Sequence, residues 1–347
     1  MRSVLILFGG ASPEHEVSRR SAAAVIENIN RENNQIHTVG ITKAGCWYYT
    51  RADAEEIRSG AWERRRGNIP AMLDYTSEKN GLLLFTNPIQ RVEIDVAFPV
   101  LHGENCEDGK MQGLLELTRI PFVGPGLRAS ANAMDKATTK VILQAAGIAQ
   151  ADYIVFRQYN FDGESAVSQV ESKFVHPVFV KPSANGSSCG VSKVKRRDEL
   201  IDAIGAAFQF DDKVLVEEFV DGRELEVAVL GNEDAFASVC GEIVSGSEFY
   251  DYNAKYVNSD SRLYIPAPLD PEKAEEIRGV ALKAYRALEC GGLSRVDFFL
   301  QENGRVVLNE INTLPGFTDI SMYPKLMMHS KEIGYGELIE LLLDSAV

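Results

Sequence analysis

The hydrophobic positions of the first 125 residues form short apolar runs that alternate with helix-like stretches. The segment SVLILFGG is an apolar run ending in two glycines, and SRRSAAAVIENI carries apolar residues at helical spacing. Two more apolar runs, IHTVGIT and VEIDVAFPVLHG, follow. Strands alternating with helices predict a Rossmann-like α/β unit with a parallel sheet, whose ligand-binding loops lie at the carboxyl ends of the strands.

The pattern changes after GPGLRAS, residues 124–130, whose glycines and proline predict a domain boundary. The next stretch, SANAMDKATTKVILQAAGI, predicts one amphipathic helix closed by Gly147. HPVFVKPSANGSSCGVSKV predicts a strand, a flexible loop and a strand, and KVLVEEFVDGRELEVAVLG predicts a strand, a turn and a strand. This part of the chain is therefore typical of an α+β unit.

The last third begins with a polar, aromatic segment, SEFYDYNAKYVNSDSRLYIP, which predicts a loop. A helix at PEKAEEIRGVALKAYRALEC, strands at SRVDFFLQ and RVVLNEIN, and a terminal helix follow. We predict three domains of mixed α/β and α+β class, at residues 1–125, 126–220 and 221–347.

Composition narrows the classes of partner. The 347 residues carry a net charge of −14, which argues against wholesale binding to nucleic acid or to an anionic membrane. No run of about 18 apolar residues predicts a membrane span, and the first apolar run continues into glycines and charges rather than a signal-peptidase site. The five cysteines are scattered without a CxxC pair, which predicts reduced thiols in a cytoplasmic protein.

An acid and an amide stand two residues apart at the end of the last predicted strand. Glu310 and Asn312 therefore point to the same face, and Arg295 and Asp297 share a face of the preceding strand. Asp297, Glu310 and Asn312 would form a set of oxygen ligands suited to Mg²⁺, with Arg295 beside developing negative charge. A solvated strand end or a structural salt-bridge network would also explain these residues.

Two further clusters have the chemistry of a nucleotide site. Lys181 precedes a loop containing Ser187, Ser188 and Gly190, whose N–H groups could fold over phosphate oxygens. The loop is no Walker A motif, and a mobile surface turn is the alternative. The strand VLVEEF ends in Glu217 and Glu218, with Glu224 just beyond. Backbone groups at such an edge could bind adenine and a carboxylate could bind ribose, although exposed acids on a turn would look the same.

Seven stretches resemble the D-alanine–D-alanine ligases of the ATP-grasp superfamily, in family order and across essentially the whole chain. They are FGGASPEHEVS, LHGENCEDGKMQGLLEL, MDKATTK, FVKPSANGSSCGVSKV, YDYNAKY, SRVDFF and LNEINTLPGFTDIS. The resemblance implies a three-domain ATP-grasp ligase with ATP between the central and C-terminal domains. It also implies two Mg²⁺ or Mn²⁺ ions held by Asp297, Glu310 and Asn312, room for a monovalent cation, and a homodimer formed through the N-terminal domain.

On the substrate side, the resemblance implies that Glu14 holds the amino group of the first D-alanine and that Ser187 and Tyr256 complete a hydrogen-bonded trio. His102 would lie near the first substrate, and Lys255 and Ser321 would bind the carboxylate of the second. Arg295 and the N–H of Gly316 would stabilise the oxyanion. Residues 245–262 would form a lid over the site.

On the nucleotide side, the resemblance implies that Lys136 and Lys181 grip the phosphates, with Ser188 in the phosphate loop. The adenine-binding hinge would run from Glu217 through Glu218 and Phe219 to Val220, and Glu224 would bind ribose. Cys106 and Cys189 stand where the family usually has glycine and an apolar residue, and we interpret both as small space-filling side chains.

The implied reaction phosphorylates the first D-alanine and then transfers its acyl group to the second, for peptidoglycan precursor synthesis. Met322 follows Ser321 where vancomycin-resistance ligases commonly carry arginine, which favours D-alanine over D-serine or D-lactate as second substrate. The N-terminal stretch ENINRENNQIHTVGITKAGCWYY resembles the D-serine group and keeps that alternative open. Another ATP-grasp ligase and a nucleotide-binding regulatory protein are less consistent with SPEHEVS, NAKY and the retained Arg295, Asp297, Glu310 and Asn312.

Overall fold

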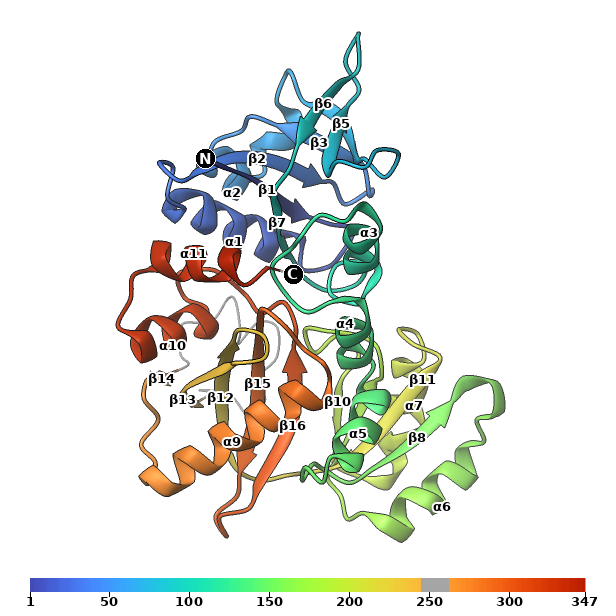
Figure 1. Ribbon diagram of the computed structural model, residues 1–347. Helices are drawn as coiled ribbons and strands as arrows, with labels where there is room; N and C mark the ends of the chain where they lie inside the picture. Colours follow the sequence, from blue (N-terminus) through green and yellow to red (C-terminus); the bar gives the residue numbers. More distant parts are fainter. Residues whose placement is uncertain (245–261, 347) are drawn as a thin grey trace.

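The computed structural model describes residues 1–244 and 262–346, whose strands form three sheets, each the centre of a separate unit (Figure 1). Lys255 and Tyr256, together with most of the predicted lid, lie outside the described residues. Within the described ranges, no helix combines the length and the apolar composition that crossing a membrane requires.

The first sheet is mixed, with the strand order β6-β5-β4-β3-β2-β1-β7. Its strands are β1 (Arg2–Gly9), β2 (Asn34–Ile41), β3 (Trp47–Thr50), β4 (Ile69–Leu73), β5 (Gly81–Leu84), β6 (Gln90–Glu93) and β7 (Val96–Leu101). The prediction of a parallel sheet is right for β2, β1 and β7 and wrong for β3 to β6, which pair antiparallel. Residues 42–46, 74–80 and 85–89 are too short for a crossover, which needs about a dozen residues, so β2–β3, β4–β5 and β5–β6 pair antiparallel. The connection from β3 to β4 is longer and contains α2 and η1, and connection length does not explain that antiparallel pair. The helices of this unit are α1 (His15–Asn28), α2 (Ala54–Ser59), η1 (Ala61–Arg64) and α3 (Lys110–Thr118).

Two helices, α4 (Leu127–Met134) and α5 (Lys136–Ala145), replace the single helix predicted for residues 130–148. The break is Asp135, whose backbone is extended (φ −84°, ψ 97°). Its carboxylate accepts from the N–H of Thr138, which caps α5, and from the hydroxyl of Ser183 at 2.6 Å, and it also pairs with Lys213. These polar contacts stabilise the break at Asp135, although the helical spacing of apolar residues continues across it.

The second sheet is antiparallel, in the order β10-β9-β11-β8. Its unit contains β8 (Tyr153–Arg157), η2 (Gln158–Asn160), α6 (Gly163–Lys173), β9 (Val178–Pro182), β10 (Ser192–Val194), η3 (Arg197–Glu199), α7 (Leu200–Ala207) and β11 (Lys213–Glu218). The predicted strand, loop and strand are the β9–β10 hairpin. The buried hydrophobic cluster of this unit consists only of residues between 156 and 216.

The third sheet is also antiparallel, in the order β14-β13-β12-β15-β16. Its unit contains β12 (Arg223–Leu230), β13 (Phe236–Val244), β14 (Arg262–Tyr264), α9 (Pro271–Ala287), β15 (Leu293–Leu300), β16 (Val306–Asn312), α10 (Met322–Lys331) and α11 (Tyr335–Asp344). The predicted strand–turn–strand at 213–231 is β11 and β12, which belong to different sheets. The predicted terminal helix is two helices, because Glu332 takes a left-handed backbone (φ 54°) at the end of α10.

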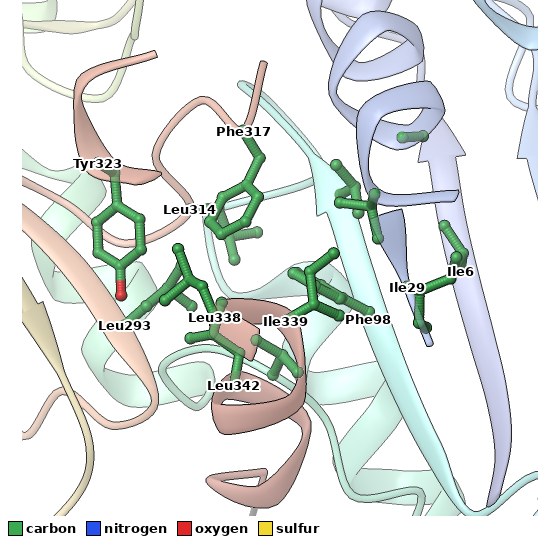
Figure 2. Packing of buried hydrophobic residues seen from close by; sticks show 14 of the residues in the cluster. Ile6, Ile29, Phe98, Leu293, Leu314, Phe317, Tyr323, Leu338, Ile339 and Leu342 are labelled. Atoms are coloured by element: carbon green, nitrogen blue, oxygen red, sulfur yellow. The ribbon is translucent and has the colours of Figure 1, made fainter. Parts of the chain in front are cut away.

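The first and third units share one hydrophobic core (Figure 2). Ile6, Ile29 and Phe98 from the first unit pack with Leu314 and Phe317 from the third, and helix α11 lies against α1 (Figure 1). The ring of Phe317 meets those of Phe98, Tyr323 and Tyr335 at centroid distances of 5.7, 5.6 and 5.7 Å. The loop after β16 is thereby fixed against the first sheet.

Candidate active site

A cavity of about 380 Å³ is lined by residues from all three units. This volume lies in the range of small-molecule sites. Every predicted site residue within the described part of the chain lines it: Glu14, His102, Lys136, Lys181, Ser187, Ser188, Glu217, Glu218, Phe219, Val220, Glu224, Arg295, Asp297, Glu310, Asn312, Gly316, Ser321 and Met322. The fold therefore brings together residues as far apart in the chain as Glu14 and Met322.

One edge of the cavity is closed by a contact between the first and second units. Glu14 immediately precedes α1 and is almost fully buried, and its carboxylate accepts a hydrogen bond from the hydroxyl of Ser187 in the β9–β10 loop. Gly103 leaves room for this carboxylate, since a Cβ at its φ of +77° would stand 2.8 Å from Oε2 of Glu14. The contact places a single negative charge where the loop meets helix α1.

Glu107 is a second acid at this edge that the sequence reasoning missed. It lines the cavity, and its carboxylate lies close to Gly186 in the loop. Burial, helped by the negative charge of Glu14, raises the pKa of Glu107 to about 8. Glu107 could have been predicted from its place in HGENCEDG, which is part of a stretch that resembles the family.

Two lysines approach the cavity from the second unit and from the helix before it. Lys136 begins α5 and donates from Nζ to the carbonyl of Asn185 at 2.6 Å, and burial lowers its pKa. Lys181 on β9 donates to Oε2 of Glu217 at 2.6 Å. Two ammonium groups beside a loop of N–H groups form an arrangement that can bind a polyphosphate.

Glu217 is buried between two lysines, one of which the sequence reasoning missed. Lys140 on α5 lies 3.2 Å from Oε1 of Glu217 and also donates to the carbonyl of Ala151. Burial alone would raise the pKa of Glu217, but the charges of Lys181 and Lys140 hold it at about 2. Lys140 is the last residue of MDKATTK, so the motif contained this signal.

The segment between β11 and β12 forms the wall of the cavity beside Glu217. Oε1 of Glu218 accepts from the N–H of Asp152 at 3.0 Å, and the ring of Phe219 lies under Nζ of Lys193 at 4.5 Å. Val220 is buried in a small cluster that also contains Ala151 and Val307. Glu224 lies farther along, on β12. An apolar wall with backbone groups at its edge can accommodate a flat base.

The opposite wall is formed by β15 and β16. Arg295 donates to both oxygens of Asp297, at 2.8 and 2.7 Å, and lies 3.1 Å from Glu226. Asp297 pairs in register with Glu310, and its Oδ2 accepts from Asn312 at 2.9 Å. Burial opposes the charge on Arg295, but Asp297 and Glu226 hold its pKa well above the ordinary value. Arg295 is thus a permanent cation in the cavity.

The candidate metal ligands can be judged by their donor atoms. No group of three His, Cys, Asp or Glu side chains with metal-site geometry occurs among residues 1–244 and 262–346. Asp297 and Glu310 supply two carboxylates and Asn312 an amide, all lining one cavity. Mg²⁺ requires only a few protein oxygens when phosphate oxygens fill the rest of its coordination shell, so this set of residues fits the ion.

The turn after β16 completes this wall. Gly316 lines the cavity where a Cβ would stand 2.9 Å from Oγ of Ser321, and Ser321 Oγ accepts from the N–H of Thr318 at 3.0 Å. Met322 begins α10, is buried, and presents an apolar side chain to the same end of the cavity. His102 faces the turn from the end of β7, and its Nδ1 lies 2.9 Å from the carbonyl of Leu314.

Comparisons with known proteins point to one family. Residues 3–125 match the family model "D-ala D-ala ligase N-terminus", and residues 142–344 match "D-ala D-ala ligase C-terminus". The chain is 49% identical to the D-alanine–D-alanine ligase of Acetivibrio thermocellus, over 100% of this chain and 96% of the relative. It is 46% identical to that of Clostridium novyi, over 100% and 98%.

Solved structures agree with these matches. The structure titled as the VanG D-Ala:D-Ser ligase from Enterococcus faecalis superposes with a TM-score of 0.90 at 38% identity, covering 99% of this chain and 98% of the other. The D-alanine–D-alanine ligase from Coxiella burnetii superposes with a TM-score of 0.88 at 31% identity, covering 99% and 93%.

Proposed function

This chain belongs to the D-alanine–D-alanine ligase family, and on that premise we propose that it joins two D-alanine molecules into D-alanyl-D-alanine with conversion of ATP to ADP and phosphate. The observation that carries the proposal is one cavity that joins Glu14, the pair Lys136 and Lys181, and Arg295. A ligase of this kind needs an anchor for an amino group, cations for phosphates and a cation at the reacting carbonyl. The product would serve peptidoglycan synthesis.

The first step activates a carboxylate, which is a poor acyl donor because its leaving group would be oxide. An oxygen of the D-alanine carboxylate attacks the γ-phosphorus of ATP, the bond from phosphorus to the bridging oxygen breaks, and ADP leaves. The product is D-alanyl phosphate. Lys136 and Lys181 offset phosphate charge, while Glu14 holds the amino group of D-alanine and aims its carboxylate at the nucleotide.

The second step forms the peptide bond. The neutral amine of the second D-alanine attacks the carbonyl carbon of D-alanyl phosphate, and a tetrahedral oxyanion forms. Arg295 and the N–H of Gly316 stabilise this oxyanion, and it collapses to the amide as the bond to the phosphate oxygen breaks and the proton given up by the amine nitrogen leaves with the phosphate. Acylphosphates react with water, so the cavity has to be closed during both steps, and residues 245–262 are our candidate for the lid.

Asp297, Glu310 and Asn312 are proposed to hold two Mg²⁺ or Mn²⁺ ions. When bound, these ions neutralise charge on the ATP phosphates during phosphoryl transfer. The support is the chemistry of the donor set and its position beside Arg295.

We propose D-alanine rather than D-serine as the second substrate. Met322 offers the methyl group of D-alanine an apolar wall and gives a serine hydroxyl no partner. Burying that hydroxyl unpaired costs roughly 1–3 kcal/mol, or about 5- to 150-fold in selectivity. The 49% identity to the D-alanine–D-alanine ligase of Acetivibrio thermocellus supports this choice, whereas among the solved structures the D-Ala:D-Ser ligase (38%) is more similar to the chain than the Coxiella burnetii D-alanine–D-alanine ligase (31%).

Two coarser features complete the proposal. We propose that the protein acts in the cytoplasm, where ATP is available, in keeping with its scattered cysteines. We also propose a homodimer formed through the first unit, on the strength of the family resemblance. A monovalent cation remains an optional third ion.

Incubation with ATP, Mg²⁺ and equal concentrations of D-alanine and D-serine tests the proposal, with ADP and dipeptides measured by mass spectrometry. The expected result is ADP release that depends on D-alanine, with D-alanyl-D-alanine predominating. ADP release that ignores D-alanine would overturn the ligase assignment. A predominance of D-alanyl-D-serine would overturn only the argument from Met322.

A further inference from the structure

Ser21 lies on the buried face of α1 and is outside the set of side chains that line the cavity. It is fully buried, and its Oγ lies 3.3 Å from Nε2 of His102 and 3.2 Å from the backbone nitrogen of Phe317. One hydroxyl of the first unit therefore contacts both His102 and the turn that carries Gly316. Because Ser21 does not line the cavity, an effect on the reaction is expected to pass through these two partners.

The hydrogen-bond directions in this cluster follow from its donors and acceptors. The carbonyl of Leu314 can only accept, so Nδ1 of His102 carries the ring proton and donates to it at 2.9 Å. In the neutral ring Nε2 is then an acceptor. The hydroxyl of Ser21 donates to Nε2 and accepts from the N–H of Phe317. Burial lowers the pKa of His102, in agreement with a neutral ring.

The chain of bonds spans the turn on both sides of Gly316. His102 holds the carbonyl of Leu314, two residues before Gly316, and Ser21 holds the N–H of Phe317, the residue after it. The carbonyl of Phe317 accepts from the hydroxyl of Tyr335 on α11. The Phe317 ring is packed in the shared core (Figure 2). The direction of the Gly316 N–H therefore depends on α1 as well as on β16.

We propose that Ser21 is a positioning residue of the ligase reaction, which donates to Nε2 of the Nδ1–H ring of His102 and orients the Leu314–Phe317 turn so that the N–H of Gly316 meets the oxyanion. This inference rests on the proposed function. It assigns His102 a supporting task, because both ring nitrogens are used by protein atoms. A donor displaced by a fraction of an ångström loses much of its effect on a transition state.

The test compares Ser21→Ala with Ser238→Ala in the full chain. Ser238 is an equally buried serine of β13 that accepts from the N–H of Ala228 at 2.9 Å and donates to the carbonyl of Val239, but it does not line the cavity. Both variants lose a buried hydroxyl, so both lose stability. Only Ser21→Ala should lower kcat for dipeptide formation, by about 10- to 100-fold, with KM for ATP within about 2-fold of the parent.

Two readouts separate positioning from general damage. Nitrogen-15 spectra of the histidine rings, with His102→Asn to assign the resonance, should show a neutral Nδ1–H ring in the parent and a shifted Nε2 in Ser21→Ala. In a double-mutant cycle, Ser21→Ala should reduce kcat far less when His102 is already asparagine. If Ser21→Ala does not fold, Ser21→Cys carries the same test, because a thiol keeps the volume and donates weakly.

Unchanged His102 resonances in Ser21→Ala, or a kcat equal to that of Ser238→Ala, would overturn the proposal. A parent protein without D-alanine-dependent ADP release would overturn the proposed function instead. In that case the ring spectra still decide whether Ser21 donates a hydrogen bond to Nε2 of His102.

Discussion

The two hydrophobic cores that flank the cavity differ in which parts of the chain build them. The first core takes its buried residues from both the first and the third unit, between positions 4 and 123 and between 228 and 343. The core of the second unit uses only positions 156 to 216. The turn after β16, with Leu314 and Phe317, is therefore fixed by packing between distant segments, whereas the second unit, which carries Lys181 and the loop after it, packs on itself.

The second unit meets the rest of the molecule mainly through polar contacts and one small apolar cluster. Lys136 reaches Asn185, Asp135 pairs with Lys213, and Ser187 donates to Glu14. These contacts join polar groups rather than apolar side chains. The comparison teaches that packing between the first and third units sets the position of the turn that carries Gly316, whereas polar contacts hold the second unit against them.

The largest expected effect comes from deleting core volume on the two sides. Phe98→Ala should destabilise the protein by about 3–5 kcal/mol, and Ile204→Ala in the second unit by about 2–5 kcal/mol. Because of the shared core, Phe98→Ala should loosen the first and third units together, whereas Ile204→Ala should loosen the second unit alone. Hydrogen exchange followed by peptide mass spectrometry measures this. Faster exchange in all three units of Ile204→Ala would break the comparison.

A change on the wall formed by β15 and β16 should remove turnover without loosening either hydrophobic core. Glu310→Gln keeps the shape of the side chain but weakens a candidate metal ligand, so kcat should fall about 100- to 1,000-fold at an unchanged melting temperature. Glu302→Gln, at an exposed position after β15, is the matched control and should retain activity. Near-normal ligase activity in Glu310→Gln would remove Glu310 from the metal site.

The smallest effect concerns the ionic junction to the second unit. Burial would raise the pKa of Asp135, but Lys213 and Ser183 lower it to about 2 from an ordinary value of 3.8. A lowered carboxyl pKa stabilises the fold above the unfolded pKa, and this stability is lost as the pH falls from about 4 to 2. At neutral pH the contribution is at most about 2 kcal/mol. Urea unfolding at pH 7, 4 and 3 measures the free energy of unfolding of the parent and of Asp135→Asn. The difference between the two proteins should shrink as the pH falls. A difference that is the same at all three pH values would contradict this prediction.

Strand periodicity predicted part of the cavity lining, and the family resemblance supplied the rest, including Glu14, Lys136 and Gly316. Glu310 and Asn312 could be placed on one face from strand periodicity alone, and the cavity receives both. The antiparallel half of the first sheet and the break at Asp135 could not be predicted, because they depend on connection lengths and on contacts with Ser183 and Lys213, far along the chain. Ser21 was missed for the same reason, since only tertiary packing gives it partners.

Isotope transfer from the substrate carboxylate tests the central claim most directly. If D-alanine is activated by phosphorylation, one of its carboxylate oxygens leaves with the phosphate when the amine of the second D-alanine displaces it. D-alanine labelled with oxygen-18 in the carboxylate is incubated with ATP, Mg²⁺ and the protein, and the released phosphate is analysed by mass spectrometry. The account predicts one oxygen-18 atom per phosphate for every dipeptide formed. Unlabelled phosphate alongside normal dipeptide formation would contradict it.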